Sequence, residues 1–148
     1  MNKYINSIPF NMIRLCIDSY NGYKITGKAY NSTISECIDF MDIYEVILRM
    51  DRVFDHNGNP LSSQIRRSFH QEDTVYPYQN KPSTFVSYEE LAKHKGKIAA
   101  FDIVVKGRRN STWQGCVFHK DIEYTFSTIL DMIKILDSLL KSYCSQLK

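Results

Sequence analysis

The sequence contains no run of apolar residues that approaches the roughly 18 needed to span a membrane. It also lacks an excess of charge, because 19 Lys and Arg stand against 16 Asp and Glu. The resulting net charge of +3 excludes a histone-like basic protein and an acidic DNA mimic. The amino-terminal residues lack the apolar segment of a secretory signal. We therefore predict a cytoplasmic protein with no membrane partner.

Cysteine is scarce, and its spacing is loose. Cys16, Cys37, Cys116 and Cys144 form none of the Cys-x-x-Cys pairs that are typical of structural zinc sites. Cys116 and His119 are three positions apart on a predicted strand, so they point to opposite faces and cannot chelate one ion together. We expect reduced, buried thiols and predict no metal site and no cofactor.

Glycine is also scarce, and the six glycines stand apart from one another. A phosphate-binding loop needs several glycines at close spacing, so nucleoside triphosphate hydrolysis is not expected. No glycine-flanked serine or cysteine marks a nucleophile. Asp51 and Asp137 occupy matched positions on two predicted helices, and a polar helix surface is the simpler interpretation of both. We predict no catalytic residue, with a small enzyme of unknown reaction as an alternative.

An internal repeat is the main feature of the sequence. Residues 40–54 align without gaps on residues 126–140, at a constant offset of 86. In each segment the apolar residues recur with the spacing of one helical face, and each opens with a capping pattern, at Asp42 and at Thr128. Both segments are predicted to be amphipathic helices. The alignment indicates an ancient duplication, and the alternative is two generic units whose apolar periods coincide.

Upstream of each predicted helix the apolar residues alternate with polar ones, as they do in a β-strand. The alternating segments cover about 13–18 and 101–106, and each is followed by a turn and a second strand, near 24–30 and 112–119. A short third strand is expected before each helix. The sequence thus predicts an α+β fold with two pseudo-repeats of a β-hairpin, a short third strand and an amphipathic helix. We expect an antiparallel sheet with the helices packed on one face.

A chain of this length ordinarily folds as one domain, so we expect residues 1–148 to form a single domain. Repeat unit 1 covers about 9–55 and repeat unit 2 about 98–146. A partly structured insertion at about 56–97 lies between them. A capping box that opens at Ser87 predicts a short helix in this insertion.

The predicted hairpin of unit 2 has the most distinctive composition in the chain. Cations stand there beside the only tryptophan and an amide, a combination that can clamp a phosphate, stack on a base or anchor a protein. The alternative is a solvated turn with the tryptophan packed into the core. A second basic cluster in the insertion could extend this surface. The candidate binding residues are Lys106, Arg108, Arg109, Asn110, Trp113 and Gln114 of the hairpin, with Arg66 and Arg67 of the insertion.

The hairpin and the helix after it resemble a group of small uncharacterised proteins from anaerobic Gram-positive bacteria. Their hairpin pattern, R-x-N-x-[ST]-W-Q-G, is matched here by Arg108, Asn110, Thr112, Trp113, Gln114 and Gly115. Their helix is matched at Phe126, Leu130, Ile133, Lys134 and Asp137. The resemblance covers chiefly the carboxy-terminal third of the chain and implies no activity. The longer central insertion is a departure from the group.

We interpret the sequence as that of a non-enzymatic binding protein that contacts its partner through this hairpin. Exposed sheet edges and an aromatic-rich insertion favour self-association as a homodimer or higher oligomer. A host protein or a nucleotide-like small molecule is the other predicted partner, and nucleic acid has weaker support. The alternative is an inhibitor carried by a phage or mobile element. Such an inhibitor would block a defence nuclease, as anti-CRISPR proteins do, or trap a nucleotide signal.

Overall fold

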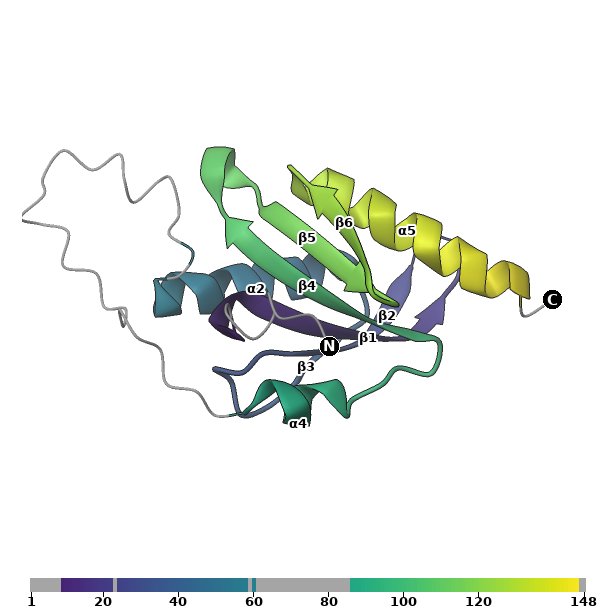
Figure 1. Ribbon diagram of the computed structural model, residues 1–148, viewed down its shortest axis with the longest axis horizontal. Coiled ribbons are helices and arrows are strands. Elements are labelled where there is room, and N and C mark those ends of the chain that lie inside the picture. Colours follow the sequence, from purple (N-terminus) through teal and green to yellow (C-terminus); the bar gives the residue numbers. More distant parts are fainter. Residues whose placement is uncertain (1–8, 23, 59, 61–85, 147–148) are drawn as a thin grey trace, which may run out of the picture.

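The computed structural model describes residues 9–22, 24–58, 60 and 86–146. These residues form an antiparallel sheet of six strands in the order β3-β2-β1-β4-β5-β6 (Figure 1). The strands are β1 (Met12–Tyr20), β2 (Ile25–Tyr30), β3 (Ile38–Phe40), β4 (Ala99–Gly107), β5 (Gln114–His119) and β6 (Ile122–Phe126). The helices are α2 (Ile43–Asn57), α4 (Tyr88–Ala92) and α5 (Ile129–Gln146), with short 3-10 turns η1 (Pro9–Asn11) and η3 (Arg109–Ser111).

The two predicted units form the two halves of this sheet. Unit 1 supplies β1, β2 and β3 followed by α2, and unit 2 supplies β4, β5 and β6 followed by α5. The strands β1 and β4 meet antiparallel in the middle, so both units share one sheet. The predicted α+β fold, with a hairpin, a third strand and a helix in each repeat, is confirmed.

The two hairpins also share their detailed geometry. In each of them the register shifts just beyond a glycine, Gly27 in unit 1 and Gly115 in unit 2. A Cβ on either glycine would lie 1.9 Å from a backbone oxygen of the neighbouring strand. Gly27 pairs with Phe40 and Gly115 with Phe126. The equivalent glycines are thus 88 positions apart and the equivalent phenylalanines 86, because the turn before the third strand is longer in unit 1.

Two equivalent residues meet at the centre of the sheet. With the hairpin offset of 88, Arg14 corresponds to Asp102, and these two residues are direct partners across β1 and β4. Arg14 Nη1 donates a hydrogen bond to Asp102 Oδ1 at 3.1 Å. The pseudo-twofold axis that relates the two units therefore passes through this ion pair.

The main core lies between the sheet and the helices α2 and α5, which cover one of its faces. Alternate residues of the strands point into this layer, where they meet the apolar stripes of the two helices. Its largest buried side chains include Phe40, Phe54, Phe101 and Trp113. Burial of each large apolar side chain stabilises the fold by about 1.5–3 kcal/mol. Within the described residues, no helix is both long and apolar enough to cross a membrane.

The short helix α4 packs on the opposite face of the sheet, through Leu91 (Figure 1). It begins after Ser87, whose side chain accepts a hydrogen bond from the first turn, as the capping box predicts. Tyr88 Oη donates to Asp102 Oδ2 at 3.2 Å, and Arg14 donates to a backbone oxygen at the end of the helix. The helix therefore covers the ion pair on the pseudo-twofold axis.

Candidate functional site

The tip of the β4–β5 hairpin contains most of the binding residues predicted from the sequence. Trp113 is only 2% exposed and packs edge-on against Phe54 of α2, with ring centroids 5.6 Å apart. Its Nε1 donates a hydrogen bond to Asp51 Oδ1 at 3.0 Å. Of the two locations compatible with the sequence, core and surface, this tryptophan occupies the core.

Arg108 is also buried, although it is charged. Its Nη1 donates to Asp51 Oδ1 at 3.0 Å and to Asp55 Oδ1 at 2.8 Å, and its Nε donates to Pro60 O at 2.6 Å. The guanidinium also lies over the ring of Phe54. Arg108 and Trp113 thus tie the hairpin to the carboxy-terminal half of α2, and both side chains are buried in this chain.

The remaining hairpin residues form an exposed turn that is stabilised by hydrogen bonds between its own residues. Gln114 Oε1 accepts a hydrogen bond from Arg109 N at 2.9 Å, and its Nε2 donates to Arg109 O at 3.0 Å. Asn110 has a φ of 59°, in the left-handed region that asparagine tolerates well. The exposed members of the predicted set are Lys106, Arg109 and Asn110. A contact surface at this tip stays a prediction, and Arg66 and Arg67 lie outside the described residues.

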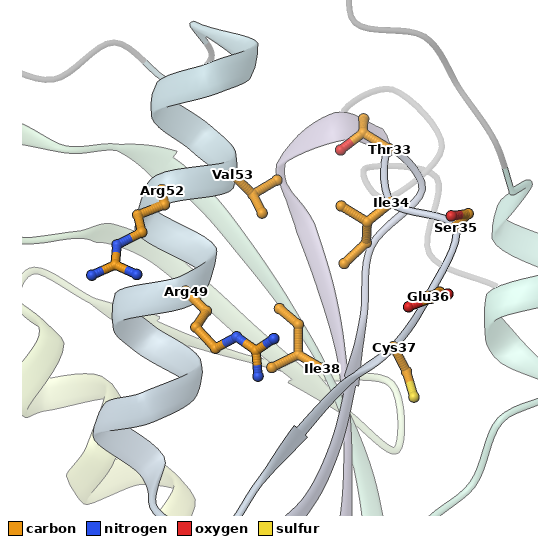
Figure 2. A pocket seen from close by; sticks show the side chains of 9 residues that line it. All are labelled: Thr33, Ile34, Ser35, Glu36, Cys37, Ile38, Arg49, Arg52 and Val53. Carbon is orange, nitrogen blue, oxygen red and sulfur yellow. The ribbon is translucent and has the colours of Figure 1, made fainter.

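A groove opens between α2 and the turn that joins β2 to β3 (Figure 2). Its volume is about 480 Å³, which lies within the range of small-ligand sites. Ile34, Ile38 and Val53 give it an apolar floor. Arg49 reaches from α2 toward the floor, whereas Arg52 extends away from the turn (Figure 2). The other lining residues are Thr33, Ser35, Glu36 and Cys37.

The guanidinium of Arg49 at this groove makes only long polar contacts. Arg49 Nη1 lies 3.6 Å from Glu45 Oε2 and 3.5 Å from Asp39 O. Exposed ion pairs of this kind contribute about 0–1 kcal/mol, so an anionic ligand can replace Glu45 at little cost. Arg52 is exposed and makes no hydrogen bond or ion pair with any described residue.

A buried polar network fixes the turn that forms the other wall of the groove. Asn31 Oδ1 accepts a hydrogen bond from Thr33 N at 2.9 Å, and Asn31 Nδ2 donates to Met12 O at 2.8 Å. Asn57 Nδ2 at the end of α2 donates to Thr33 Oγ1 at 3.0 Å. Both walls are thereby joined to each other and to β1, so the groove is formed before any ligand arrives.

Unit 2 has a counterpart of this groove, between α5 and the β5–β6 turn. It is smaller, with a volume of about 160 Å³. With the helix offset of 86, Val53 corresponds to Leu139, and each lines the groove of its own unit. The positions of the two arginines are taken by Ile135 and Ser138. The two units therefore share the place of the groove and differ in its size and charge.

His119 and Tyr143 hold the end of α5 onto β5 in this second groove. His119 Nδ1 lies 3.3 Å from Ala100 O, which can only accept, so Nδ1 carries the proton. Its Nε2 therefore accepts a hydrogen bond from Tyr143 Oη at 2.8 Å. Burial lowers the pKa of His119, so the imidazole is neutral at neutral pH.

Acidification is expected to weaken the contact between His119 and Tyr143. The pKa of His119 is lower in the folded than in the unfolded state, so its contribution to stability is complete above about pH 6.5 and is lost as the pH falls below that value. We expect the melting temperature of the wild type to fall more steeply between about pH 7.5 and 5 than that of His119→Gln. The exposed His94, changed to Gln, is the control. Equal pH profiles for wild type and His119→Gln would contradict the assignment.

The thiols of the two central hairpins are unsuited to nucleophilic chemistry. Cys16 and Cys116 are buried and free, and burial raises the pKa of both thiols, which leaves little thiolate at neutral pH. Cys116 packs with Met12 on one face of the sheet, while His119 contacts Tyr143 on the other, as their spacing predicts. The described part of the chain holds no group of three His, Cys, Asp or Glu side chains placed to bind a metal ion.

Comparison of the chain with models of protein families, with curated proteins and with solved structures gives no match. The groove beside α2 is also not predicted from the sequence, because Arg49 and Arg52 have the spacing of ordinary polar-face residues. One signal was present: the two repeats align with different offsets in their hairpins and helices. That difference marks a longer turn beside α2, and the groove lies at this turn.

Proposed function

We propose that the protein is a non-enzymatic binding protein that holds an organic anion in the groove beside α2. The observation that carries this proposal is the Arg49 guanidinium, which makes only long contacts and reaches over an apolar floor. The planar guanidinium can donate two parallel hydrogen bonds to a carboxylate or a phosphate. Ile34, Ile38 and Val53 would cover an apolar or aromatic body attached to that group. The ligand class is therefore an anion with an apolar body.

The composition of the groove supports binding rather than catalysis. Among the described residues, its lining contains no histidine and no aspartate. Ser35 and Glu36 are exposed to solvent, and the free thiol of Cys37 has no histidine beside it in the described lining. A nucleophile in this place would need a base within about 2.6–3.2 Å. The groove instead offers a fixed shape and a cation, which are the requirements of recognition.

Phenyl phosphate and adenosine monophosphate are suitable probes, since each joins a phosphate to an aromatic body. We expect titration with either probe to shift the amide NMR signals of residues 33–38 and 49–53. Arg49→Ala is expected to weaken binding about tenfold, because it removes a charge-assisted pair of hydrogen bonds. Arg109→Ala, which removes the same charge from the hairpin tip, is the matched control and is expected to leave the affinity unchanged.

The same pair of variants separates the groove from the hairpin surface predicted from the sequence. If Arg109→Ala loses the probes while Arg49→Ala retains them, the binding site is the hairpin and the groove assignment is wrong. If neither probe saturates the wild type, nor does benzoate as a carboxylate analogue, the proposed function itself is refuted.

A further inference from the structure

The outer surface of α2 carries exposed apolar side chains. Met41, just before the helix, is 65% exposed, and Tyr44 and Leu48 are 63% and 61% exposed. Tyr44 and Leu48 are four positions apart, so they lie on one stripe of the helix, and Arg52 continues that stripe. An apolar stripe rimmed by charge is typical of an interaction surface.

This stripe is not a general property of the repeated unit. At the helix offset of 86, the positions of Met41 and Leu48 are taken in unit 2 by the polar residues Ser127 and Lys134. Leu130 keeps the third position apolar and is 58% exposed. A continuous apolar stripe is therefore a feature of α2, and the shared fold alone does not account for it.

The charges along the stripe complement those of a second copy of the same helix. Asp42 and Glu45 lie at the amino-terminal end of α2, and Arg49 and Arg52 lie further along it, where the acidic Asp51 and Asp55 are already paired with Arg108. If two copies pack antiparallel about a twofold axis near Leu48, Glu45 of each copy comes opposite Arg52 of the other. The same arrangement places Tyr44 beside the opposing Arg52, where ring and guanidinium attract each other. An interface of this kind is isologous, so each favourable pair occurs twice.

We propose that a second copy of this chain covers the outer face of α2, through antiparallel pairing of the two helices around Leu48. One helix face makes a small interface, so we expect a weak dimer that dissociates in the micromolar range. The proposal therefore names a surface for the self-association that is predicted from the sequence. Arg52 also lines the groove beside α2, but its side chain extends away from the turn, whereas Arg49 reaches toward the apolar floor (Figure 2).

Two exposed single substitutions test this pairing. Arg52→Glu places acidic groups opposite each other in the dimer, and Glu45→Lys places basic groups opposite each other. Each variant alone is therefore expected to sediment as a monomer of 17.3 kDa at concentrations where the wild type forms dimers. An equimolar mixture restores both attractive pairs, so it is expected to form heterodimers with an affinity close to that of the wild type. Sedimentation velocity from about 1 to 300 µM measures all four samples.

Three results would overturn the proposal. The wild type could remain monomeric at the highest concentration. Both variants could dimerise as the wild type does, which would place the interface elsewhere. The mixture could stay monomeric although both variants keep the circular dichroism spectrum of the wild type. Leu48→Glu, at the axis of the proposed dimer and outside the described lining of the groove, is also expected to be monomeric. Titration of this variant with phenyl phosphate shows whether the anion site at Arg49 stands without the dimer, so failure of one proposal is distinguished from failure of the other.

Discussion

Gly115→Ala is expected to lower the free energy of unfolding by more than about 4 kcal/mol, which is a large part of the stability of an ordinary domain. A Cβ at this position lies 1.9 Å from Val104 O and 3.0 Å from Val104 C. Both atoms belong to the backbone of β4, so the methyl group can be accommodated only if β4 and β5 separate. Gly27→Ala is expected to have the same effect, because its Cβ lies 1.9 Å from Cys16 O.

Gly107→Ala is the matched control for this pair of substitutions. Its Cβ meets only the side chain of Gln114, at 3.1 Å from Oε1, and that side chain can move. We expect this change to cost less than about 1 kcal/mol. Urea unfolding followed by the fluorescence of the single tryptophan measures the differences. Equal stabilities of Gly115→Ala and Gly107→Ala would show that the close approach of the two strands does not restrict position 115.

Trp113→Ala is expected to cost about 3–5 kcal/mol. The indole is buried beside Phe54, and its loss leaves a large cavity between the hairpin and α2. Trp113→Phe should cost less, because it keeps an aromatic ring and loses chiefly the hydrogen bond to Asp51, worth about 1–3 kcal/mol. Far-ultraviolet circular dichroism measures unfolding in both variants, since neither has a tryptophan.

Arg109→Ala is the control at the same hairpin, and a change within about 0.5 kcal/mol is expected for its exposed side chain. The outcome also decides between the two interpretations of the tryptophan. A Trp113→Ala protein of wild-type stability that no longer binds its partner would assign Trp113 to a contact surface. A destabilised protein is the expected result.

The periodicities of the sequence were sufficient to predict the hairpins and the long helices. Buried side chains recur every two residues in a strand and every 3.6 residues in a helix, so the apolar pattern of the sequence shows both kinds of element directly. The beginning of α2 was predictable for a local reason as well, because Asp42 Oδ1 accepts a hydrogen bond from Tyr44 N at 2.7 Å. The order of the strands was not predictable, since it depends on pairing between β1 and β4, which are distant in the sequence.

The candidate site was less predictable, because its residues depend on contacts between distant elements. The composition of the hairpin suits a surface as well as a core. What buries Trp113 is the position of Asp51 and Phe54 on α2, in the other unit. The cation at Arg49 becomes part of a site only because a longer turn stands opposite it. A match between the length of a turn and the residues on a helix face produces no periodic pattern in the sequence.

The ion pair on the pseudo-twofold axis is a place where two identical copies of the unit would not fit together. A single ancestral unit that formed a symmetric homodimer would have presented the same residue twice at this place, and two like charges as little exposed as Arg14 and Asp102 would have repelled each other. In this chain the two equivalent positions differ, and arginine and aspartate form an ion pair there. The two units differ in the same way at their grooves, since two arginines line the groove of unit 1 and a histidine–tyrosine pair lines that of unit 2.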